Sequence, residues 1–371
     1  MKRITMIVML IAAAVMPRWA FADPPGPVLP AMMDADTQKM LDKGLTYLSQ
    51  KQRADGSWLN SGGYGSYPQV MTSLAALAMM GNGSTPEGGK YARQVRKAML
   101  CTLRVGEASM EPSGRCLISG GGAEYQSMYG HGFSMLFLAQ CYGVEVNPDY
   151  EKRLRAVLDG AIKLTAQSQS NVGAQFKNAG GWIYTPSGGG DEGSVTVTQL
   201  QALRACRNVG LVVPQDTITR AVLYLKASQN ADGGISYSFS SRGSSRPAIS
   251  AAGIACFYSA GVYDQVDGGE ESKLVAKLVD YVKKNVRVGQ SDGHYFYTHF
   301  YMAQAFYMRS GGSPQAKADW EAYYKSMVKW LKENQAPDGS WAGDGVGTTY
   351  GTAIACMILE LPYGYLPIVQ K

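Results

Sequence analysis

The sequence predicts an all-α protein built from six helical hairpins that close into a ring. Two observations predict this fold. A short motif occurs three times, at 43–58, 220–235 and 325–341, and charged amphipathic segments alternate with nearly uncharged, alanine-rich ones along the chain. Repeats of this kind build architectures in which each unit buries its apolar face against its neighbours.

Each motif copy has an aromatic residue followed by Leu, a Gln five residues after the aromatic residue, and a Gly four residues after the Gln. The side chains with the most specific roles are Gln52, Trp58, Gln229, Gln335 and Trp341. We expect the Gln amide to pair with carbonyl groups at the end of its own helix. The Gly permits the turn that follows, and the Trp packs against the neighbouring repeat. All of these roles are structural.

The charged segments predict an outer layer of helices, because a solvent-facing helix carries its charges on one face. The six outer helices are predicted at 37–50, 90–104, 150–168, 217–228, 271–286 and 318–334. The alanine-rich segments that follow them suit helices packed on both sides. These inner helices are predicted at 70–80, 131–142, 195–208, 248–260, 298–309 and 348–359.

Six outer helices around six inner helices can close into a ring or form an open solenoid. The end units of an open solenoid need polar caps. Here the first and last units both carry the complete motif. This favours the closed ring, and the repeats assign residues 36–371 to one domain.

The first 22 residues are typical of a signal peptide. Lys2 and Arg3 precede an apolar stretch, and Ala20–Ala22 offers a cleavage site of the A-x-A kind. An uncleaved anchor is the alternative, but Pro17 and Arg18 interrupt the apolar run. We therefore expect export after cleavage near Ala22, followed by a flexible, proline-rich leader at 23–35.

The formal net charge is +6, and the signal peptide contributes half of it. The remainder is too small to argue for a nucleic-acid partner. No later apolar run is long enough for a stable membrane span. Neither a P-loop nor a dinucleotide fingerprint occurs, so no cofactor is predicted. The composition does not indicate a particular protein partner.

Six cysteines follow the signal peptide. Cys101 and Cys116 flank one connecting loop, and export would permit a disulfide between them. The other four fall at the same place in successive repeats and are interpreted as small buried side chains.

The three motif copies resemble the repeats of the prenyltransferase and squalene-hopene (terpene) cyclase family. The resemblance covers roughly residues 36–371 and implies the α/α toroid fold. It further implies that the exported protein binds a hydrophobic, isoprenoid-type ligand in the central cavity; whether it transforms that ligand stays open. The alternative is a non-catalytic cell-envelope module that uses its glycine-rich rim loops, such as 239–246.

The family's two catalytic patterns are absent from the chain. Terpene cyclases of class II use the middle Asp of D-x-D-D, and protein prenyltransferases bind zinc through D-x-C and a distant His. Neither D-x-D-D nor D-x-C occurs here, so neither the acid nor the zinc site carries over, and no metal site is predicted.

All loops that run from an outer to an inner helix emerge on one rim of such a ring. The candidate catalytic residues at this rim are Asp191, Glu192, His131 and His299. We expect the two histidines, which come from opposite units, to face one another across the cavity mouth as part of an acid–base set. The candidate ligand-binding residues are Tyr129, His294, Tyr295, Tyr297, Tyr301, Phe133 and Tyr350. A purely structural role, in which these side chains hydrogen-bond the rim loops, stays open.

Overall fold

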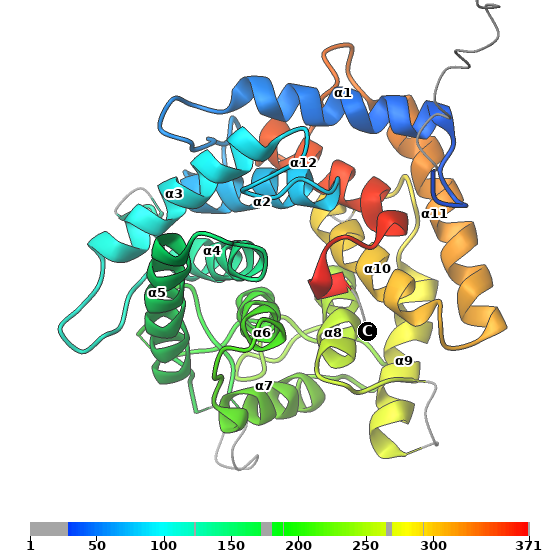
Figure 1. Cartoon of the computed structure of the whole chain (residues 1–371). Helices are drawn as coiled ribbons and strands as arrows, with labels where there is room; N and C mark the ends of the chain where they lie inside the picture. The colour runs from blue at the N-terminus through cyan, green and yellow to red at the C-terminus, as the bar shows by residue number, and fades with distance from the viewer. Residues whose placement is uncertain are drawn as a thin grey trace, which may run out of the picture.

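The computed structural model describes residues 29–121, 124–171, 180–187, 189–264, 269–291 and 293–369 (Figure 1). These residues form twelve α-helices, with two short 3-10 helices near the C-terminus and no extended strand among them. The predicted signal peptide, 1–22, lies outside the described residues, as does the part of the leader up to residue 28.

Every predicted helix is present, with ends shifted by a few residues. The outer helices are α1 (Ala35–Lys51), α3 (Ala92–Ala108), α5 (Pro148–Gln167), α7 (Gln215–Ala227), α9 (Glu270–Asn285) and α11 (Pro314–Asn334). The inner helices are α2 (Pro68–Gly81), α4 (Ser127–Tyr142), α6 (Gly193–Asn208), α8 (Pro247–Ser259), α10 (Tyr295–Arg309) and α12 (Thr348–Glu360). Each outer helix, the loop after it and the next inner helix form one unit, numbered 1 to 6 in chain order.

The six units form an α/α toroid. Each inner helix contacts the inner helices on both sides, and α12 returns to α2, so the inner ring is closed (Figure 1). Helix α1 contacts both helices of unit 6, α11 and α12. The closed ring is therefore confirmed over the open solenoid.

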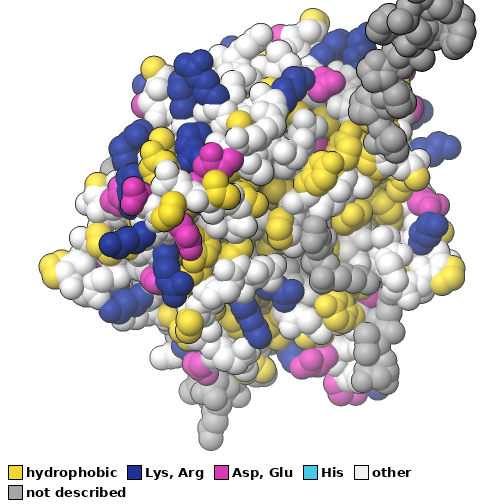
Figure 2. Space-filling view, viewed as in Figure 1, with side chains coloured by type: hydrophobic (Ala, Val, Ile, Leu, Met, Phe, Trp, Pro, Cys, Tyr) yellow, Lys and Arg dark blue, Asp and Glu magenta, His cyan; other side chains and the backbone are white. Residues whose placement is uncertain are grey.

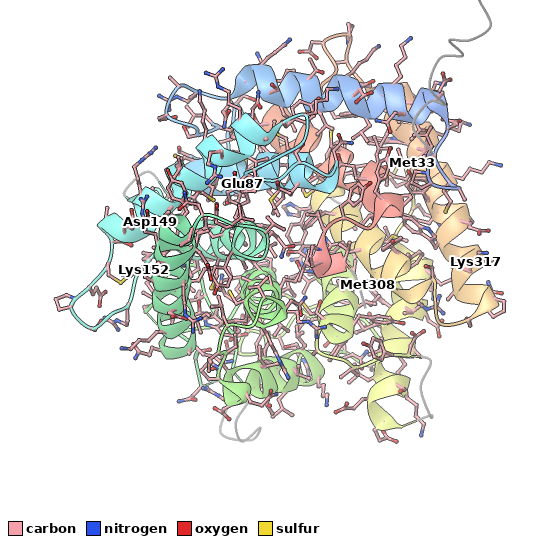
Figure 3. The ribbon with its side chains drawn as sticks, viewed as in Figure 1. Met33, Glu87, Asp149, Lys152, Met308 and Lys317 are labelled. Carbon is pink, nitrogen blue, oxygen red and sulfur yellow. The ribbon has the colours of Figure 1, made fainter. Side chains whose placement is uncertain are left out.

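Charged side chains lie on the outside of this ring. Figure 3 shows Lys152 on α5 and Lys317 on α11 at the outer side of the molecule. In Figure 2, Lys, Arg, Asp and Glu side chains spread over the periphery, while hydrophobic side chains gather nearer the middle of that face. The inner helices, by contrast, are buried along nearly their whole length, which explains their uncharged sequences.

In four of the six units, the motif Gln links the outer helix to the next one. Gln52 donates from Nε2 to the carbonyl of Gly56 in its own loop, at 3.0 Å, and to that of Gln94 in α3, at 2.9 Å. Gln169, Gln229 and Gln335 do the same toward α7, α9 and α1. The expectation that this amide serves its own helix end was wrong, because both acceptors lie beyond that helix. We call this pair of bonds the glutamine link.

The Gly and Trp of the motif are explained by their contacts with the next unit. Gly56 has φ +95°, and a Cβ there would lie 2.3 Å from the carbonyl oxygen of Lys97 in the next outer helix. Only glycine tolerates both the left-handed backbone and that approach. Trp341 packs its ring against Gly44 of α1, as expected for contact with the neighbouring repeat. Its Nε1 donates to the carbonyl of Leu331 at 2.8 Å.

The leader is shorter than predicted. Met33 is buried, and Leu29 and Met32 are partly buried against the core. The N–H of Met33 donates to the carbonyl of Pro30 at 2.9 Å, which forms a turn before α1. Residues 29–35 thus belong to the folded domain, because their apolar side chains find a surface there.

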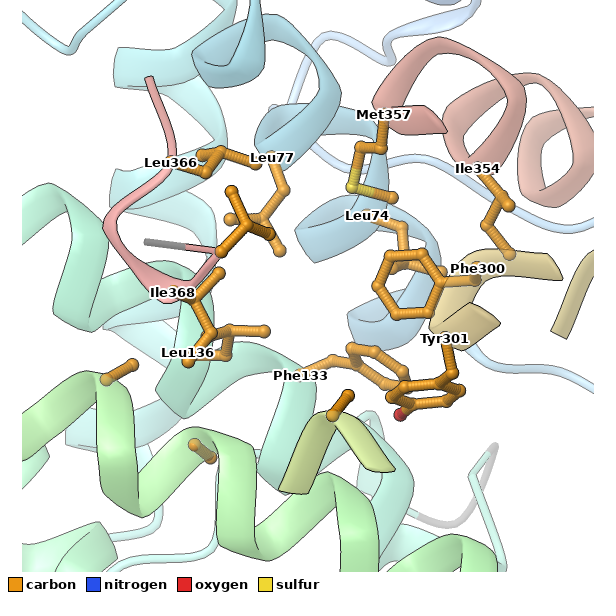
Figure 4. Packing of buried hydrophobic residues seen from close by; sticks show 14 of the residues in the cluster. Leu74, Leu77, Phe133, Leu136, Phe300, Tyr301, Ile354, Met357, Leu366 and Ile368 are labelled. Atoms are coloured by element: carbon orange, nitrogen blue, oxygen red, sulfur yellow. The ribbon is translucent and has the colours of Figure 1, made fainter. Parts of the chain in front are cut away.

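The C-terminal tail closes the end of the ring opposite to the outer-to-inner loops. After α12, η3 (Leu361–Tyr363) and η4 (Pro367–Val369) turn inward across the inner helices. Figure 4 shows Leu366 beside Leu77 and Ile368 beside Leu136. The space left between the tail and the ring is only about 20 Å³, so the tail fills this end of the axis.

The proposed disulfide is absent, and all six cysteines are free thiols. Cys116 points to α5, where its Sγ donates to the carbonyl of Val157 at 3.2 Å. Cys101 lies on α3 near Asp55 and Arg104, a different neighbourhood. The prediction was therefore wrong, because flanking one loop does not bring the two side chains to the same face of α3.

No helix within the described ranges is both long and apolar enough to cross a membrane.

Candidate functional site

A cavity of about 550 Å³ lies on the axis of the toroid and opens at the rim of the outer-to-inner loops. All six units contribute to its wall, from the loops and from the first two turns of the inner helices. This volume falls within the range of small-molecule sites. The cavity is blind, because the C-terminal tail fills the other end of the axis.

The inner helices set the depth of the wall residues. Along α10, His294 lies at the rim, Tyr297 one turn deeper and Phe300 another turn below, where it also touches the space under the tail. Tyr350 and Ile354 repeat this order on α12. With a rise of 1.5 Å per residue, the cup is about 9 Å deep from His294 to Phe300.

The wall is rich in aromatic rings, and nine aromatic side chains line it. Five predicted ligand-binding residues are among the lining residues: Tyr129, Phe133, His294, Tyr297 and Tyr350. The hydroxyl of Tyr297 is buried without a hydrogen-bond partner. That oxygen has almost no accessible surface, so the ring of Tyr297 forms its part of the cavity wall.

Tyr295 and Tyr301 do not line the cavity. Tyr295 faces the outer layer, with its ring centroid 4.3 Å from that of Trp330 on α11. Tyr301 is fully buried behind Tyr297, at 4.9 Å between ring centroids.

His131 and His299 do not face one another. The Nδ1 of His131 accepts the N–H of Ile118 at 3.1 Å, and its Nε2 is 3.0 Å from the Thr165 hydroxyl of α5. The Nδ1 of His299 is 3.1 Å from the Tyr323 hydroxyl of α11. Both rings are therefore wedged between an inner and an outer helix, away from the cavity.

These two histidines hold a repeated structural position. At the corresponding place on the other inner helices stand hydroxyl residues: Thr72, Thr196, Ser250 and Thr352. Each hydroxyl accepts a backbone N–H from the preceding loop, as His131 does. Burial lowers the pKa of His131 to about 4 and that of His299 to about 3. Both imidazoles are thus neutral at pH 7, and their contacts are those of structural residues.

Asp191 and Glu192 also bond to the protein itself. Asp191 accepts from the Tyr224 hydroxyl at 2.9 Å and from the N–H of Phe239 at 2.6 Å. Glu192 caps the N-terminus of α6, where it accepts the N–H of Val195 at 2.7 Å. Burial raises the pKa of Glu192. Neither carboxyl lines the cavity, although Tyr129 reaches toward Glu192 from the wall, at 3.5 Å.

The carboxyl on the cavity wall is that of Asp344, which the sequence reasoning missed. It lies in the loop before α12 and accepts the N–H of Phe296, at the start of α10, at 2.7 Å. Burial raises its pKa, although nearby N–H groups and His294 oppose the shift. Its φ of +51° is the one positive value at a non-glycine position in the described chain. Strained backbone of this kind often occurs at functional sites. The sequence feature that could have pointed to Asp344 is an acidic residue between two glycines in a rim loop, Gly343-Asp344-Gly345.

Exposed aromatic side chains surround the mouth. Tyr64 is 56% exposed, Tyr125 66% and Tyr237 40%, and they come from three different loops. Tyr64 lies over Gly345, next to Asp344, and the two loops are joined by backbone hydrogen bonds such as Gly62 N–H to the carbonyl of Val346, at 2.8 Å. Arg246 is the cation at the mouth and makes no ion pair among the described residues.

The glycine- and serine-rich loop 239–246 is anchored at two of its serines. Ser240 donates to Asp191, and Ser245 donates to Asp232 at 2.6 Å. Phe239, the first residue of the loop, is buried. Residues 240–244 are exposed, so the loop presents the polar side chains of Ser241, Arg242 and Ser244 at the surface.

Within the described ranges, no group of three or more His, Cys, Asp or Glu side chains is arranged to hold a metal ion. The four candidate catalytic residues lie in three separate neighbourhoods, which explains why they form no such cluster.

The fold and its cavity define an α/α toroid with one blind axial cup. The sequence matches no protein-family model and no curated protein sequence. Solved structures do match in fold. The type II terpene cyclase MstE from Scytonema has a TM-score of 0.54 at 14% identity, covering 90% of this chain and 98% of that one.

Two sugar-active proteins share the same architecture. The GH76A alpha-1,6-mannanase from Salegentibacter sp. HEL1_6 has a TM-score of 0.61 at 10% identity, over 89% of this chain and 100% of that chain. A D-mannose isomerase has a TM-score of 0.60 at 10% identity, over 91% and 99%. At such low sequence identities the similarity establishes the fold alone, and the activity has to be inferred from the site.

Proposed function

We propose that this protein is an exported member of the terpene-cyclase and prenyltransferase repeat class that binds an isoprenoid-type apolar ligand in its axial cup. The observation that carries the proposal is the chemistry of the wall. Nine aromatic side chains surround about 550 Å³, and the deep part is formed by apolar residues such as Leu74, Phe133 and Phe300. Burying a hydrocarbon there gains roughly 25 cal/mol for each Å² removed from water.

The aromatic wall suits an isoprenoid better than a saturated chain. Aromatic faces carry negative electrostatic potential and attract positive charge that develops on an alkene carbon. Among the proteins of similar fold, MstE has been solved with its substrate geranylgeranyl dihydroxybenzoate, which carries an isoprenoid chain. That likeness concerns the fold, and the residues of the present cup carry the proposal.

Asp344 is the acid that such a ligand would meet. Its carboxyl is on the wall, burial raises its pKa above the usual range of Asp, and the Phe296 N–H fixes its orientation. A protonated carboxyl can donate a proton to an alkene, and the aromatic wall can then stabilise the cation. We propose Asp344 as the proton donor in place of the absent D-x-D-D acid.

Ligand binding is tested with purified protein and a panel of farnesol, geranylgeraniol and squalene, with mannose and a mannan oligosaccharide for comparison. We expect a rise in melting temperature with the isoprenoids, which Phe133→Ala and Tyr350→Ala each reduce. Val212→Ala is the matched control, because that side chain is 81% exposed and far from the cup. A response to the sugars alone, or to none of these compounds, would overturn the proposal.

Catalysis and export need separate measurements. Extraction and mass spectrometry of the incubated isoprenoids would reveal a product, which Asp344→Asn should abolish while binding persists. If none of the incubated isoprenoids is converted, the protein binds its ligand without transforming it. Fractionation of the native host, with N-terminal sequencing, tests export; an intact Met1 in the cytoplasm would contradict it.

A further inference from the structure

A second hollow lies on the outer wall of the ring, between α9 and α11. Its volume is about 640 Å³, and its floor is formed by Met302 and Phe306 of the inner helix α10. Val286, at the end of α9, and Tyr323, on α11, form its sides. These four apolar side chains are almost completely buried, at 4–6% exposure. We call this hollow the unit 5 groove.

The groove lies where the glutamine link is missing. Tyr281 occupies the aromatic position of the motif in unit 5, and the residue five positions later is Val286 instead of Gln. Val286 has no side-chain amide with which to bind the next outer helix. Lys283 and Asp319 form an ion pair across the gap at 2.9 Å, and the groove opens beside it.

Unit 2, on the opposite side of the ring, provides an internal comparison. It also lacks the motif Gln and also carries a histidine, His131, at the place of His299. Glu107 of α3 and Arg153 of α5 form an ion pair at 2.7 Å, as Lys283 and Asp319 do in unit 5 with the charges reversed. The two units therefore depart from the repeat in the same way.

In unit 2 the chain fills the corresponding space with its own segment, 109–117. The N–H of Cys116 donates to the carbonyl of Gly160 at 3.3 Å. Lys163 donates from Nζ to the carbonyl of Ser113 at 2.5 Å. Arg115 donates to the side-chain oxygen of Gln167 at 3.2 Å. A basic residue and a small apolar residue are thus held along α5 by a loop that turns at 111–115. In this turn the N–H of Glu111 donates to the carbonyl of Arg115 at 2.8 Å, and the Arg115 side chain pairs with Glu111 at 2.6 Å.

The positions of α11 that correspond to these contact positions of α5 line the unit 5 groove. Gln169 and Gln335 occupy equivalent motif positions after α5 and α11, and aligning the helices on them pairs the residues. Gly160 then corresponds to Ser326, Lys163 to Lys329 and Gln167 to Glu333. All three α11 residues line the groove.

Among the described residues, unit 5 has no segment that fills this groove. The connection from α3 to α4 covers 109–126, whereas that from α9 to α10 covers only 286–294. The surface that holds segment 109–117 in unit 2 therefore has a counterpart in unit 5 without an occupant among the residues that the structure describes.

We propose that the unit 5 groove binds a short, turn-forming segment of a partner polypeptide, with a basic residue followed by a small apolar residue. Arg115 and Cys116 are the internal template for this pair. Glu333 replaces the neutral Gln167, so a basic side chain would form a charge-assisted hydrogen bond there. The Glu333 side chain is 60% exposed, and its one ion pair among the described residues is a long one, 3.9 Å, with Lys329. The Lys329 ammonium can donate to a backbone carbonyl of the partner, as Lys163 does in unit 2.

The test uses a fluorescently labelled peptide with the sequence of Ser109–Ile118, carrying Cys116→Ala, and the full-length protein. We expect a saturable rise in fluorescence anisotropy. Glu333→Lys and Ser326→Trp should each weaken binding at least about tenfold, the first by charge and the second by filling the groove. Lys325→Glu is the matched control, because Lys325 is exposed on α11 outside the groove.

Charge reversal gives a second, independent readout. The peptide that also carries Arg115→Glu should bind Glu333→Lys better than it binds the parent protein. Circular dichroism melts of each variant check that the toroid is folded. No saturable binding by folded parent protein would overturn the proposal. Binding by Glu333→Lys and Ser326→Trp as tight as that of the parent protein would also overturn it. The second result would place the peptide elsewhere, for example in unit 2 in exchange for the chain's own segment.

Discussion

The Nε2 of Gln335 in the last unit donates to the backbone carbonyl of Met40 in the first unit, at 2.9 Å. The bond is the glutamine link used between units elsewhere, so the ring closes with its own repeat interaction. It joins residues at nearly opposite ends of the described chain.

Gln335→Ala should destabilise the protein by about 1–3 kcal/mol, because it leaves the carbonyls of Met40 and Gly339 without their donor. Chemical denaturation monitored by circular dichroism measures the loss. Lys317→Ala is the control, since its 3.8 Å ion pair with Glu321 is exposed and worth about 0.5 kcal/mol or less. Equal effects of the two changes would contradict the role of the link.

Gly339→Ala should destabilise more than a positive φ alone explains. Gly339 has φ +91°, and an added Cβ would lie 2.6 Å from the carbonyl oxygen of Lys43. Gly210 has φ +83° with open space around it, so Gly210→Ala costs only the left-handed strain of about 1–2 kcal/mol. The difference in unfolding free energy between the two variants isolates the close approach of units 6 and 1.

His131 should make the fold sensitive to acid. Its folded pKa is about 4 because burial disfavours the charged ring, while that of the unfolded chain is near 6.5. Between these values the unfolded chain binds a proton that the folded chain does not. The stabilising contribution of neutral His131 is therefore present above about pH 6.5 and is lost as pH falls toward 4.

Replacing this ring by the residue of the other units, His131→Thr, should remove that dependence. The slope of unfolding free energy against pH should fall by up to about 1.4 kcal/mol per pH unit near pH 5. The buried carboxyls of Glu124, Glu192 and Glu360, whose pKa values are raised, act in the opposite sense in both proteins. The difference between parent and variant therefore reports the contribution of His131. Parallel profiles of unfolding free energy against pH would show that His131 does not contribute to the acid sensitivity.

Asp344→Asn should keep the fold while removing the acid from the cup. Asn tolerates the left-handed backbone at φ +51°, and its oxygen can still accept the Phe296 N–H. We expect a stability change within about 1 kcal/mol. Asp338→Asn, outside the cup, is the control for product formation. A variant that retains full turnover would show that another group donates the proton.

Cys101 should react faster than the other thiols in the native protein, although burial raises the pKa of its thiol too. It is partly exposed, whereas the other five cysteines are buried, and burial raises the pKa of Cys116 to about 12. Alkylation followed by mass spectrometry should modify Cys101 first and all six after unfolding without reductant. A thiol count of four after unfolding would reveal a disulfide.

The helices and the closed ring were predictable because they depend on periodicity and on a repeated motif. All twelve helices lie within a few residues of their predicted ranges. The glutamine link was partly misread, since its acceptors lie in a neighbouring unit about forty residues away or at the other end of the chain. A single repeat does not reveal which neighbour supplies a carbonyl.

The site was harder to predict because it depends on which stripe of each inner helix faces the axis. His131 and His299 lie near the rim, as expected, but on the outward stripe that Thr72 and Thr352 also occupy. Comparing the six inner helices position by position would have revealed this shared stripe. Asp344 lies in a loop, where no periodicity gives its direction, so its place on the wall required the structure.

The tail that runs from Leu361 to Val369 has a kinetic consequence. Because it fills one end of the axis, the cup has a single doorway among the tyrosines of the mouth. Whatever occupies the cup must depart by the route along which its successor arrives. Occupants therefore exchange one at a time, and a slow-leaving molecule blocks the next, so the residence time of the bound molecule sets the upper limit on throughput.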